Sequence, residues 1–514
     1  MINFLDFSAG ELAVAVRQRD LSAVELVGAS LDMLEQSDER LNAFTAFNPA
    51  EARASATEID RRIHQGEDVG PFAGVPLAVK DSEDAAGFHT SHGSFGHASA
   101  EPVTNDSVTV ARLKKAGCVV VGKTNLPEFG FKATTDNVAF GITRNPWDTS
   151  RTCGGSSGGS ACAVAAGIVP LATGSDGGGS IRIPSAVCGL PGFKPTTGEV
   201  PSADAQPPGW PNLSSRGVIA SNVSDIIATL QCIRGLTHSD LRSLPSDRRS
   251  LFQSGAIAPN EVRIAWSPTL GFATVDAEIR GACTAVVERL SDSGFAVTEI
   301  DSLFEADPSQ ALVAMVDAFM LRSIEPFRNT PLWSKLDPVS VLAGEFYRLT
   351  ASPLAVVDAL DSCHVFNGQF LTAMEGFDLL ICPTTAGQTP PAAELIEAEE
   401  VVTWLVALLD DSCTDSRSVA EELLKILAPF PPLNLPSGSV DGVPQLDWTR
   451  MTQPFNLIGC PAGTAVAGRT SDGMPIGIQV VGRRFDDIAV LRMLEALESR
   501  SDPNAPTTPI ADAS

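Results

Sequence analysis

Hydrophobic positions along this chain alternate between two spacings. Short, mainly apolar runs typical of buried strands occupy 75–79, 118–121, 168–172, 262–266, 295–300, 378–382 and 476–481. Stretches with helical spacing lie among them, at 106–115, 160–166, 276–293 and 486–497. This alternation predicts an α/β fold in which helices cover a sheet.

The N-terminal residues carry two helix starts. Ser8 and Glu11 have the spacing of a capping box, and Ser22 and Glu25 repeat it. Apolar residues at helical spacing follow each box. We therefore expect a helical hairpin within residues 1–70 that packs against a larger body.

The block from residue 301 to residue 450 is the least regular part of the chain. It leans towards helix and is rich in Phe, Leu and Met. Proline-rich loops at 385–400 and 429–447 flank a helical piece near 401–427, and another loop rich in Pro, Gly and Ser spans 199–215. We expect the block 301–450 to hold the elements that shape a substrate site.

Composition narrows the classes of function. The chain has 514 residues and a formal net charge of −26, whereas nucleic-acid binding requires a basic face, so no nucleic-acid partner is expected. Its ten cysteines form no Cys-x-x-Cys pair, which fits free thiols in a reducing compartment. No signal peptide or membrane-spanning run is visible, so we expect a cytoplasmic protein without a membrane partner.

The candidate chemistry is concentrated between residues 154 and 184, where two serines stand among glycines. Ser156 lies in the run Gly-Gly-Ser-Ser-Gly-Gly-Ser, and Ser180 ends the run Gly-Ser-Asp-Gly-Gly-Gly-Ser. Successive glycine amides can point at one spot and hold an oxyanion beside a serine nucleophile. Neither segment contains a histidine to act as base. Lys80 ends an apolar strand, where burial lowers the pKa of an amine and makes it a usable base.

Two familiar motif patterns occur here out of context. Residues 117–124 match the phosphate-loop spacing, but the four intervening residues have strand character, and Pro127 interrupts the helix that must follow. Residues 154–158 and 155–159 match the Gly-x-Ser-x-Gly elbow of α/β-hydrolases, but a loop precedes them rather than a strand. We therefore assign neither a nucleotide site nor an elbow to these segments.

Three histidines, His89, His92 and His97, cluster within nine residues. Their proximity fits a metal site, with Asp84 as the nearest carboxylate, but their spacing places them on a loop rather than on one helix face. Loop histidines without a metal are the better interpretation, so we expect neither a metal nor an organic cofactor.

The glycine-rich segments resemble the amidase signature family. The resemblance rests first on residues 74–81, 154–161 and 174–184. It extends through 121–125, 145–147, 189–195, 378–383, 455–461 and 472–479. It weakens over 301–450. The resemblance implies one large mixed sheet between helical layers and a single domain over 1–514.

The resemblance also implies roles for individual residues. Ser180 matches the nucleophile, Ser156 matches a bridging serine held by a cis peptide bond, and Lys80 matches the base. The amides expected to form the oxyanion hole belong to Gly177, Gly178, Gly179 and Ser180. The expected supporting residues are Ser157, Asp176 and Arg182. The last two are expected to brace the loop rather than touch substrate.

One position departs from the family pattern. The family usually carries a residue with a side chain where this chain has Gly177. Glycine there is expected either to loosen the oxyanion loop or to leave extra room beside the substrate carbonyl. The sequence does not decide between these two effects.

The resemblance implies a serine hydrolase that cleaves small-molecule amides, with esters and carbamates close behind, through an acyl-enzyme on Ser180. We expect a monomer or homodimer. A hydrophobic or aryl-bearing substrate is favoured by apolar residues that would equally suit ordinary helix core, namely Met315, Phe319, Met320, Leu321 and Trp333. The alternatives are the glutamine-hydrolysing component of a tRNA-dependent amidotransferase and a non-catalytic binding protein on the same scaffold.

Overall fold

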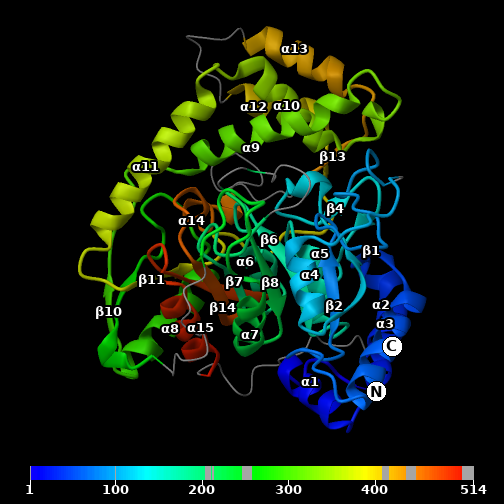
Figure 1. Ribbon diagram of the computed structural model, residues 1–514. Helices are drawn as coiled ribbons and strands as arrows, with labels where there is room; N and C mark the ends of the chain where they lie inside the picture. The colour runs from blue at the N-terminus through cyan, green and yellow to red at the C-terminus, as the bar shows by residue number, and fades with distance from the viewer. Residues whose placement is uncertain are drawn as a thin grey trace.

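One mixed sheet of 11 strands organises the molecule (Figure 1). The structure is a computed structural model that describes residues 2–98, 100–202, 210, 213–245, 257–407, 416–435 and 447–499. In spatial order the strands are β1 (Phe44–Phe47), β3 (Val119–Thr124), β2 (Pro76–Lys80), β6 (Leu171–Asp176), β8 (Ser215–Ala220), β7 (Gly192–Lys194), β14 (Ala462–Arg469), β15 (Pro475–Val481), β11 (Leu379–Pro383), β9 (Arg263–Trp266) and β10 (Ala296–Glu299). Two separate short pairs are β4 (Asp136–Asn137) with β5 (Gly141–Ile142), and β12 (Leu395–Ile396) with β13 (Leu433–Asn434).

Helices cover both faces of this sheet, and the predicted α/β class is confirmed. One apolar cluster contains residues of α4 (Val108–Lys115), α7 (Val223–Ile233), α8 (Ala277–Asp292) and α15 (Asp487–Glu498). The other contains residues of α1 (Ala9–Gln18), α2 (Ala23–Leu41), α3 (Pro49–His64), α5 (Gly158–Ala165) and α6 (Arg182–Val187). The short helix α14 (Pro454–Leu457) belongs to a third cluster.

The central strands divide their side chains between the two large clusters. Leu77 and Val120 join the first cluster, whereas Ala78, Val119 and Val121 join the second. Successive residues of a strand point to opposite faces, so both strands are buried on both sides. This explains why these runs are apolar throughout, and β3 confirms that the phosphate-loop pattern lies in a strand.

The capping boxes predicted for the N-terminal helices are confirmed. The Ser8 amide donates to Glu11 Oε2 at 2.8 Å, and the Glu11 amide donates to Ser8 Oγ at 3.1 Å. The Ser22 amide donates to Glu25 Oε2 at 2.9 Å, and the Glu25 amide donates to Ser22 Oγ at 3.1 Å. These pairs satisfy backbone donors that a helix start otherwise leaves without partners.

The strand predicted at 168–172 has the wrong bounds, because β6 spans Leu171–Asp176. Pro170 has no N–H to give a neighbouring strand, whereas the residues from Leu171 to Asp176 all pair with β8. Because β6 begins and ends later than predicted, it extends into the glycine-rich segment, and Asp176 is the last residue of a buried strand.

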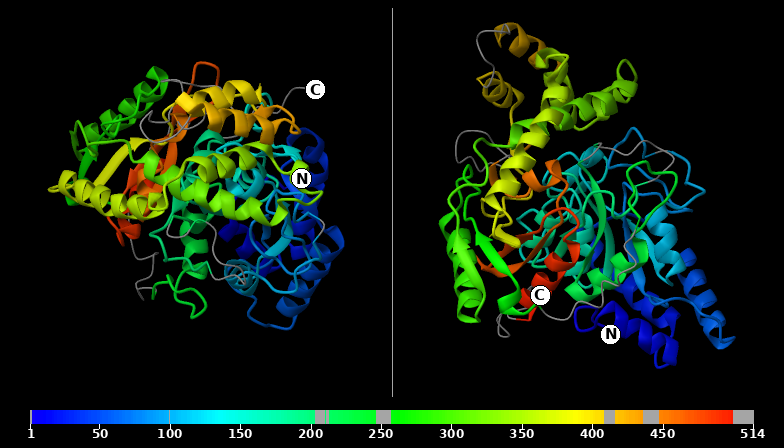
Figure 2. Two further views of the ribbon diagram at one scale, coloured as in Figure 1. Left: turned by 90° about the horizontal axis from the view of Figure 1, so that it is seen from above. Right: turned by 60° about the vertical axis from the view of Figure 1, so that its left-hand side comes forward.

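The irregular block holds a layer of helices at one end of the molecule, above the sheet in Figure 1 and projecting from the body in the right-hand view of Figure 2. These helices are α9 (Ser309–Ile324), α10 (Pro338–Thr350), α11 (Ala355–Ala373), α12 (Ala398–Ala407) and α13 (Ser416–Leu427). An apolar cluster of their own holds much of the layer together. A smaller cluster joins α9 to Leu213 and Leu457 of the body.

Parts of three expected segments lie outside the described residues. They are 203–209 and 211–212 of the loop 199–215, 408–415 of the helical piece 401–427, and 436–446 of the loop 429–447. The nine cysteines of the described part are free thiols, and Cys413 lies outside it. Among the helices that the structure describes, none is long and apolar enough to cross a bilayer.

Candidate active site

Lys80 is the last residue of β2, and its side chain is buried among serine hydroxyls. Its Nζ donates to Ser156 Oγ at 2.8 Å, to Ser157 Oγ at 2.9 Å and to Ser175 Oγ at 3.0 Å. The Lys80 amide donates to Thr173 Oγ1 of the neighbouring parallel strand β6 at 2.9 Å. The amine of Lys80 therefore lies where the carboxyl ends of β2 and β6 meet the turn before α5.

Burial lowers the pKa of Lys80 to about 7. The positive charge of Arg216 contributes to this lowering, whereas the carboxylates of Glu83 and Asp176 oppose it. Arg216 and Glu83 are themselves ion-paired, with Nη1 and Oε1 2.7 Å apart. Near neutral pH a large fraction of Lys80 is thus an uncharged amine, which has a lone pair and can accept a proton.

Ser156 and Ser157, which both accept a hydrogen bond from Lys80 Nζ, differ in their remaining contacts. Ser157 Oγ donates to the Ser175 carbonyl at 3.2 Å, so its proton is engaged. Ser156 follows a cis peptide bond after Gly155. A Cβ added to Gly155 would lie 2.5 Å from the Thr134 carbonyl oxygen, so only glycine fits beside the backbone of Thr134. Ser156 is therefore the serine whose proton remains available to Lys80.

Ser180 lies in the turn between β6 and α6 and lines an apolar cavity. Its carbonyl accepts the Ser157 amide at 3.2 Å, which ties the two serine-bearing segments together. Gly155 and Gly178 line the same cavity. The structure thus brings both predicted serine segments and the predicted lysine into one region of the molecule.

The four amides predicted for an oxyanion hole are not equivalent. The Gly179 amide donates to Asp176 Oδ1 at 2.8 Å, so a protein carboxylate already occupies it. Within the described part of the chain, the amides of Gly177, Gly178 and Ser180 have no such acceptor. Three donors rather than four are therefore left for a ligand.

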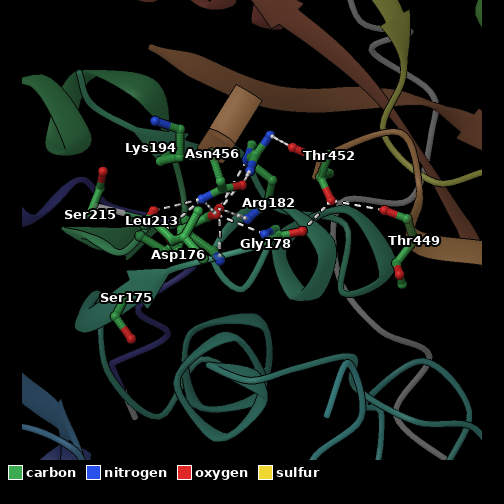
Figure 3. Close-up of polar contacts among 12 residues, drawn as sticks. Ser175, Asp176, Gly178, Arg182, Lys194, Leu213, Ser215, Thr449, Thr452 and Asn456 are labelled. Carbon is green, nitrogen blue, oxygen red and sulfur yellow. Dashed lines mark hydrogen bonds and ion pairs between the residues drawn. The ribbon is translucent and has the colours of Figure 1, made fainter. Parts of the chain in front are cut away.

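Asp176 and Arg182 form a fully buried ion pair that holds this turn (Figure 3). Asp176 Oδ1 lies 2.8 Å from Arg182 Nη2, and Oδ2 accepts the amides of Ile181 and Arg182 at 3.2 and 3.3 Å. Asn456 Nδ2 donates to Asp176 Oδ1 at 2.9 Å. Burial by itself would raise the pKa of Asp176, but the Arg182 guanidinium and these hydrogen bonds hold it well below its usual range.

Arg182 extends the brace to the C-terminal part of the sheet. Its Nη1 donates to the Thr452 carbonyl at 2.9 Å and to Gln479 Oε1 at 2.6 Å. Thr452 Oγ1 in turn donates to the Gly178 carbonyl at 2.6 Å (Figure 3). Within the described part of the chain, the contacts of Asp176 and Arg182 hold the turn that carries the glycine amides.

The space beside Gly177 is filled by Trp210. A Cβ added to Gly177 would lie 2.5 Å from Trp210 Cε3, closer than side-chain atoms approach. The expectation of extra room beside the substrate carbonyl is therefore wrong, because the indole occupies it. Trp210 also lines the cavity, so the missing side chain at Gly177 sets the position of a cavity wall.

The cavity encloses about 210 Å³ between the sheet and the helical layer. Its apolar walls include Leu312, Val316, Leu342 and Phe346 of α9 and α10. Residues of the block 301–450 line this cavity, but they are not the ones named from the sequence. Within the described part of the cavity lining, none of the five predicted residues appears, namely Met315, Phe319, Met320, Leu321 and Trp333. The α9 side chains that line the cavity, such as Leu312 and Val316, follow i, i+4 spacing. This spacing is visible in the sequence and could have identified them.

The histidine cluster lies outside this cavity lining. His92 is partly buried, and desolvation lowers its pKa to about 4. Its ring meets the ring of His97 edge to face, with centroids 5.6 Å apart. The residues that the structure describes contain no group of three His, Cys, Asp or Glu side chains able to hold a metal ion.

Replacing Arg182 by Met should destabilise the fold by about 3–5 kcal/mol, because Asp176 becomes an unpaired buried charge. Urea unfolding measures this loss. The double variant Asp176→Asn with Arg182→Met removes both charges and should be more stable than Arg182→Met alone. An Arg182→Met protein as stable as wild type would contradict the role of the ion pair.

Gly177→Ala should displace Trp210 and lower stability by about 1–3 kcal/mol, the usual effect of overpacking. The backbone at Gly177 lies outside the left-handed region, so only the indole opposes the new methyl group. Adding Trp210→Leu should remove most of the penalty, and unfolding of all four proteins gives the coupling energy. Additive effects of the two changes would show that the indole does not set the limit.

A family model described as Amidase matches residues 25–420 and 434–491 of this chain. An acylamidase of Rhodococcus erythropolis is 32% identical over 503 residues, covering 96% of this chain and 95% of the relative. A glutamyl-tRNA(Gln) amidotransferase subunit from Geobacillus kaustophilus is 30% identical over 512 residues, covering 98% of each.

Solved structures give the same assignment. A bacterial aryl acylamidase of the amidase signature family superposes with a TM-score of 0.81 at 27% identity, covering 96% of each chain. A 6-aminohexanoate cyclic dimer hydrolase with bound substrate gives a TM-score of 0.80 at 28% identity, covering 97% of each. With the site geometry, these likenesses establish that this chain belongs to the amidase family and is a hydrolase acting on the carbon–nitrogen bonds of amides.

Proposed function

We propose that this amidase hydrolyses amides of hydrophobic, aryl-bearing small molecules through an acyl-enzyme on Ser180. The observation that carries the proposal is the 2.8 Å contact between Lys80 Nζ and Ser156 Oγ, made by a buried amine whose pKa is about 7. The apolar cavity at Ser180 supports an apolar substrate. The similarity to an acylamidase and an aryl acylamidase supports the same class.

The first step is formation of the acyl-enzyme. Neutral Lys80 accepts the proton of Ser156 while Ser156 accepts the proton of Ser180, so that Ser180 Oγ bonds to the substrate carbonyl carbon. The negative charge that develops on the carbonyl oxygen is stabilised by the amides of Gly177, Gly178 and Ser180. The Lys80 ammonium then returns a proton through Ser156 to the leaving nitrogen, and the carbon–nitrogen bond breaks.

Water completes the reaction by the reverse relay. It loses a proton to the Ser156–Lys80 pair and attacks the acyl carbon, and the ester bond to Ser180 breaks as the proton returns to Ser180 Oγ. The products are a carboxylic acid and an amine. Esters and carbamates present the same carbonyl and a leaving heteroatom, so we propose them as secondary substrates.

Glutamine hydrolysis for an amidotransferase is the second candidate, because the Geobacillus amidotransferase protein is 30% identical over nearly the whole chain. The mainly apolar walls formed by α9 and α10 disfavour it, since the carboxamide and the α-carboxylate of glutamine require polar partners, and Lys132 of the lining is already paired with Asp136 and Asp337. A small-molecule amidase that works without a protein partner, as a monomer or homodimer, remains the proposal.

A panel of matched aryl amides, esters and carbamates, with L-glutamine alongside, tests the reaction class. We expect chromogenic anilides with apolar acyl groups to be cleaved and glutamine to be a poor substrate. Ammonia release from glutamine at rates above those of every anilide would favour the second candidate.

Ser180→Ala should lower turnover of the best anilide by roughly 10⁶-fold, because no acyl-enzyme can form. It should also abolish labelling by a fluorophosphonate probe, measured by mass spectrometry. Ser150→Ala is the matched control, since Ser150 is exposed on the loop before the same glycine-rich segment. Residual turnover close to wild type would remove Ser180 as nucleophile.

The pH dependence of kcat/KM tests Lys80 as the base. Only neutral Lys80 accepts a proton, so kcat/KM should fall about tenfold per pH unit below about 7 and level off above it. Glu83→Gln removes a negative charge that raises the pKa of Lys80, so the midpoint should move to lower pH. A midpoint that stays in place in this variant, or a profile unchanged in Lys80→Met, would exclude Lys80 as the titrating base.

A further inference from the structure

One acidic side chain interrupts the apolar wall of the cavity. Asp317 lies on α9 and lines the cavity with Leu312, Val313 and Val316 of the same helix face. Its residue is only 9% exposed. The mechanism of amide cleavage assigns it no task, because the relay and the oxyanion donors lie on the sheet side of the cavity.

Asp317 has no partner in the described part of the chain. Neither a hydrogen bond nor an ion pair reaches its carboxyl group there, and desolvation is the only influence on its pKa, which it raises to about 8. Buried polar groups are nearly always hydrogen-bonded, and leaving one unpaired costs free energy that an apolar residue would avoid. The unpaired carboxyl group of Asp317 therefore lowers stability, and ligand binding is a reason for it to be there.

The nearby cations are already engaged. Lys132 lines the same cavity but pairs with Asp136 and with Asp337, whose Oδ2 lies 2.9 Å from Nζ. Lys80 is held by three serine hydroxyls. Among the described residues that line the cavity, no cation is left to pair with Asp317, so a ligand can supply the positive charge.

We propose that Asp317 is a specificity residue that pairs with a basic amine carried by an otherwise apolar substrate. This rests on the proposed function of the cavity as the substrate site. The ammonium of the ligand favours the ionised carboxyl, so binding transfers one proton from Asp317 to solvent and forms an ion pair shielded from water. The net charge of −26 also favours the approach of a cation over that of an anion.

Calorimetric titration with n-hexylammonium and 1-hexanol tests the pairing without any turnover. The two probes have equal chain length and differ in the charged head group. We expect hexylammonium to bind at least tenfold more tightly to the wild-type protein, and Asp317→Asn to reduce this preference by tenfold or more. Asp361→Asn, which removes an equal charge from an exposed position on α11, should leave the preference intact.

Proton release gives a second measurement on the wild-type protein alone. At pH 7 the binding heat of hexylammonium should vary with the ionisation enthalpy of the buffer, corresponding to release of nearly one proton, and Asp317→Asn should abolish this dependence. Equal affinity for the two probes, or a preference retained in Asp317→Asn, would overturn the proposal. Because these titrations need no catalysis, their failure is distinguishable from failure of the reaction assigned to Ser180.

Discussion

The removal of one lysine amine from water is the constraint on which the site depends. Lys80 sits where two parallel strands end, and three serine hydroxyls replace the water that an ammonium group would otherwise bind. Removal from bulk water disfavours the charged amine, and the nearby positive charge of Arg216 adds to this effect, so the pKa of Lys80 falls to about 7. In the proposed mechanism Lys80 is then the base, and no histidine is needed.

A second buried charge, that of Asp176, holds the shape of the turn before Ser180. Asp176 ends β6 and gathers amides of the following turn, while Arg182 links that carboxylate to Thr452 and Gln479 from the far part of the chain. An ion pair in this position tolerates little movement, because a shift of either partner would leave the other as a buried charge without its counter-charge. The turn that carries Ser180 is therefore held in place while its three remaining amides stay open.

In the proposed function, the helical layer determines which substrates the site accepts. Its helices are held largely by their own apolar cluster, and α9 and α10 present one face of that layer to Ser180. The same chemistry on the sheet can then serve different substrates when the facing side chains change. Two side chains of this wall are Trp210, which packs beside Gly177, and Asp317 on α9.

The sequence by itself determined the alternation of strands and helices, the capping boxes, the free thiols and the glycine-rich segments with their two serines and a lysine. These features are local, since they depend on spacing and on residue type. Only the tertiary structure decided that the Gly179 amide is occupied by Asp176, that Trp210 fills the space beside Gly177, and that Asp317 lines the cavity without a partner among the described residues. Each of these features depends on how elements pack in three dimensions. Hydrophobic spacing and motif matching do not predict which side chains come into contact when the helical layer packs against the sheet.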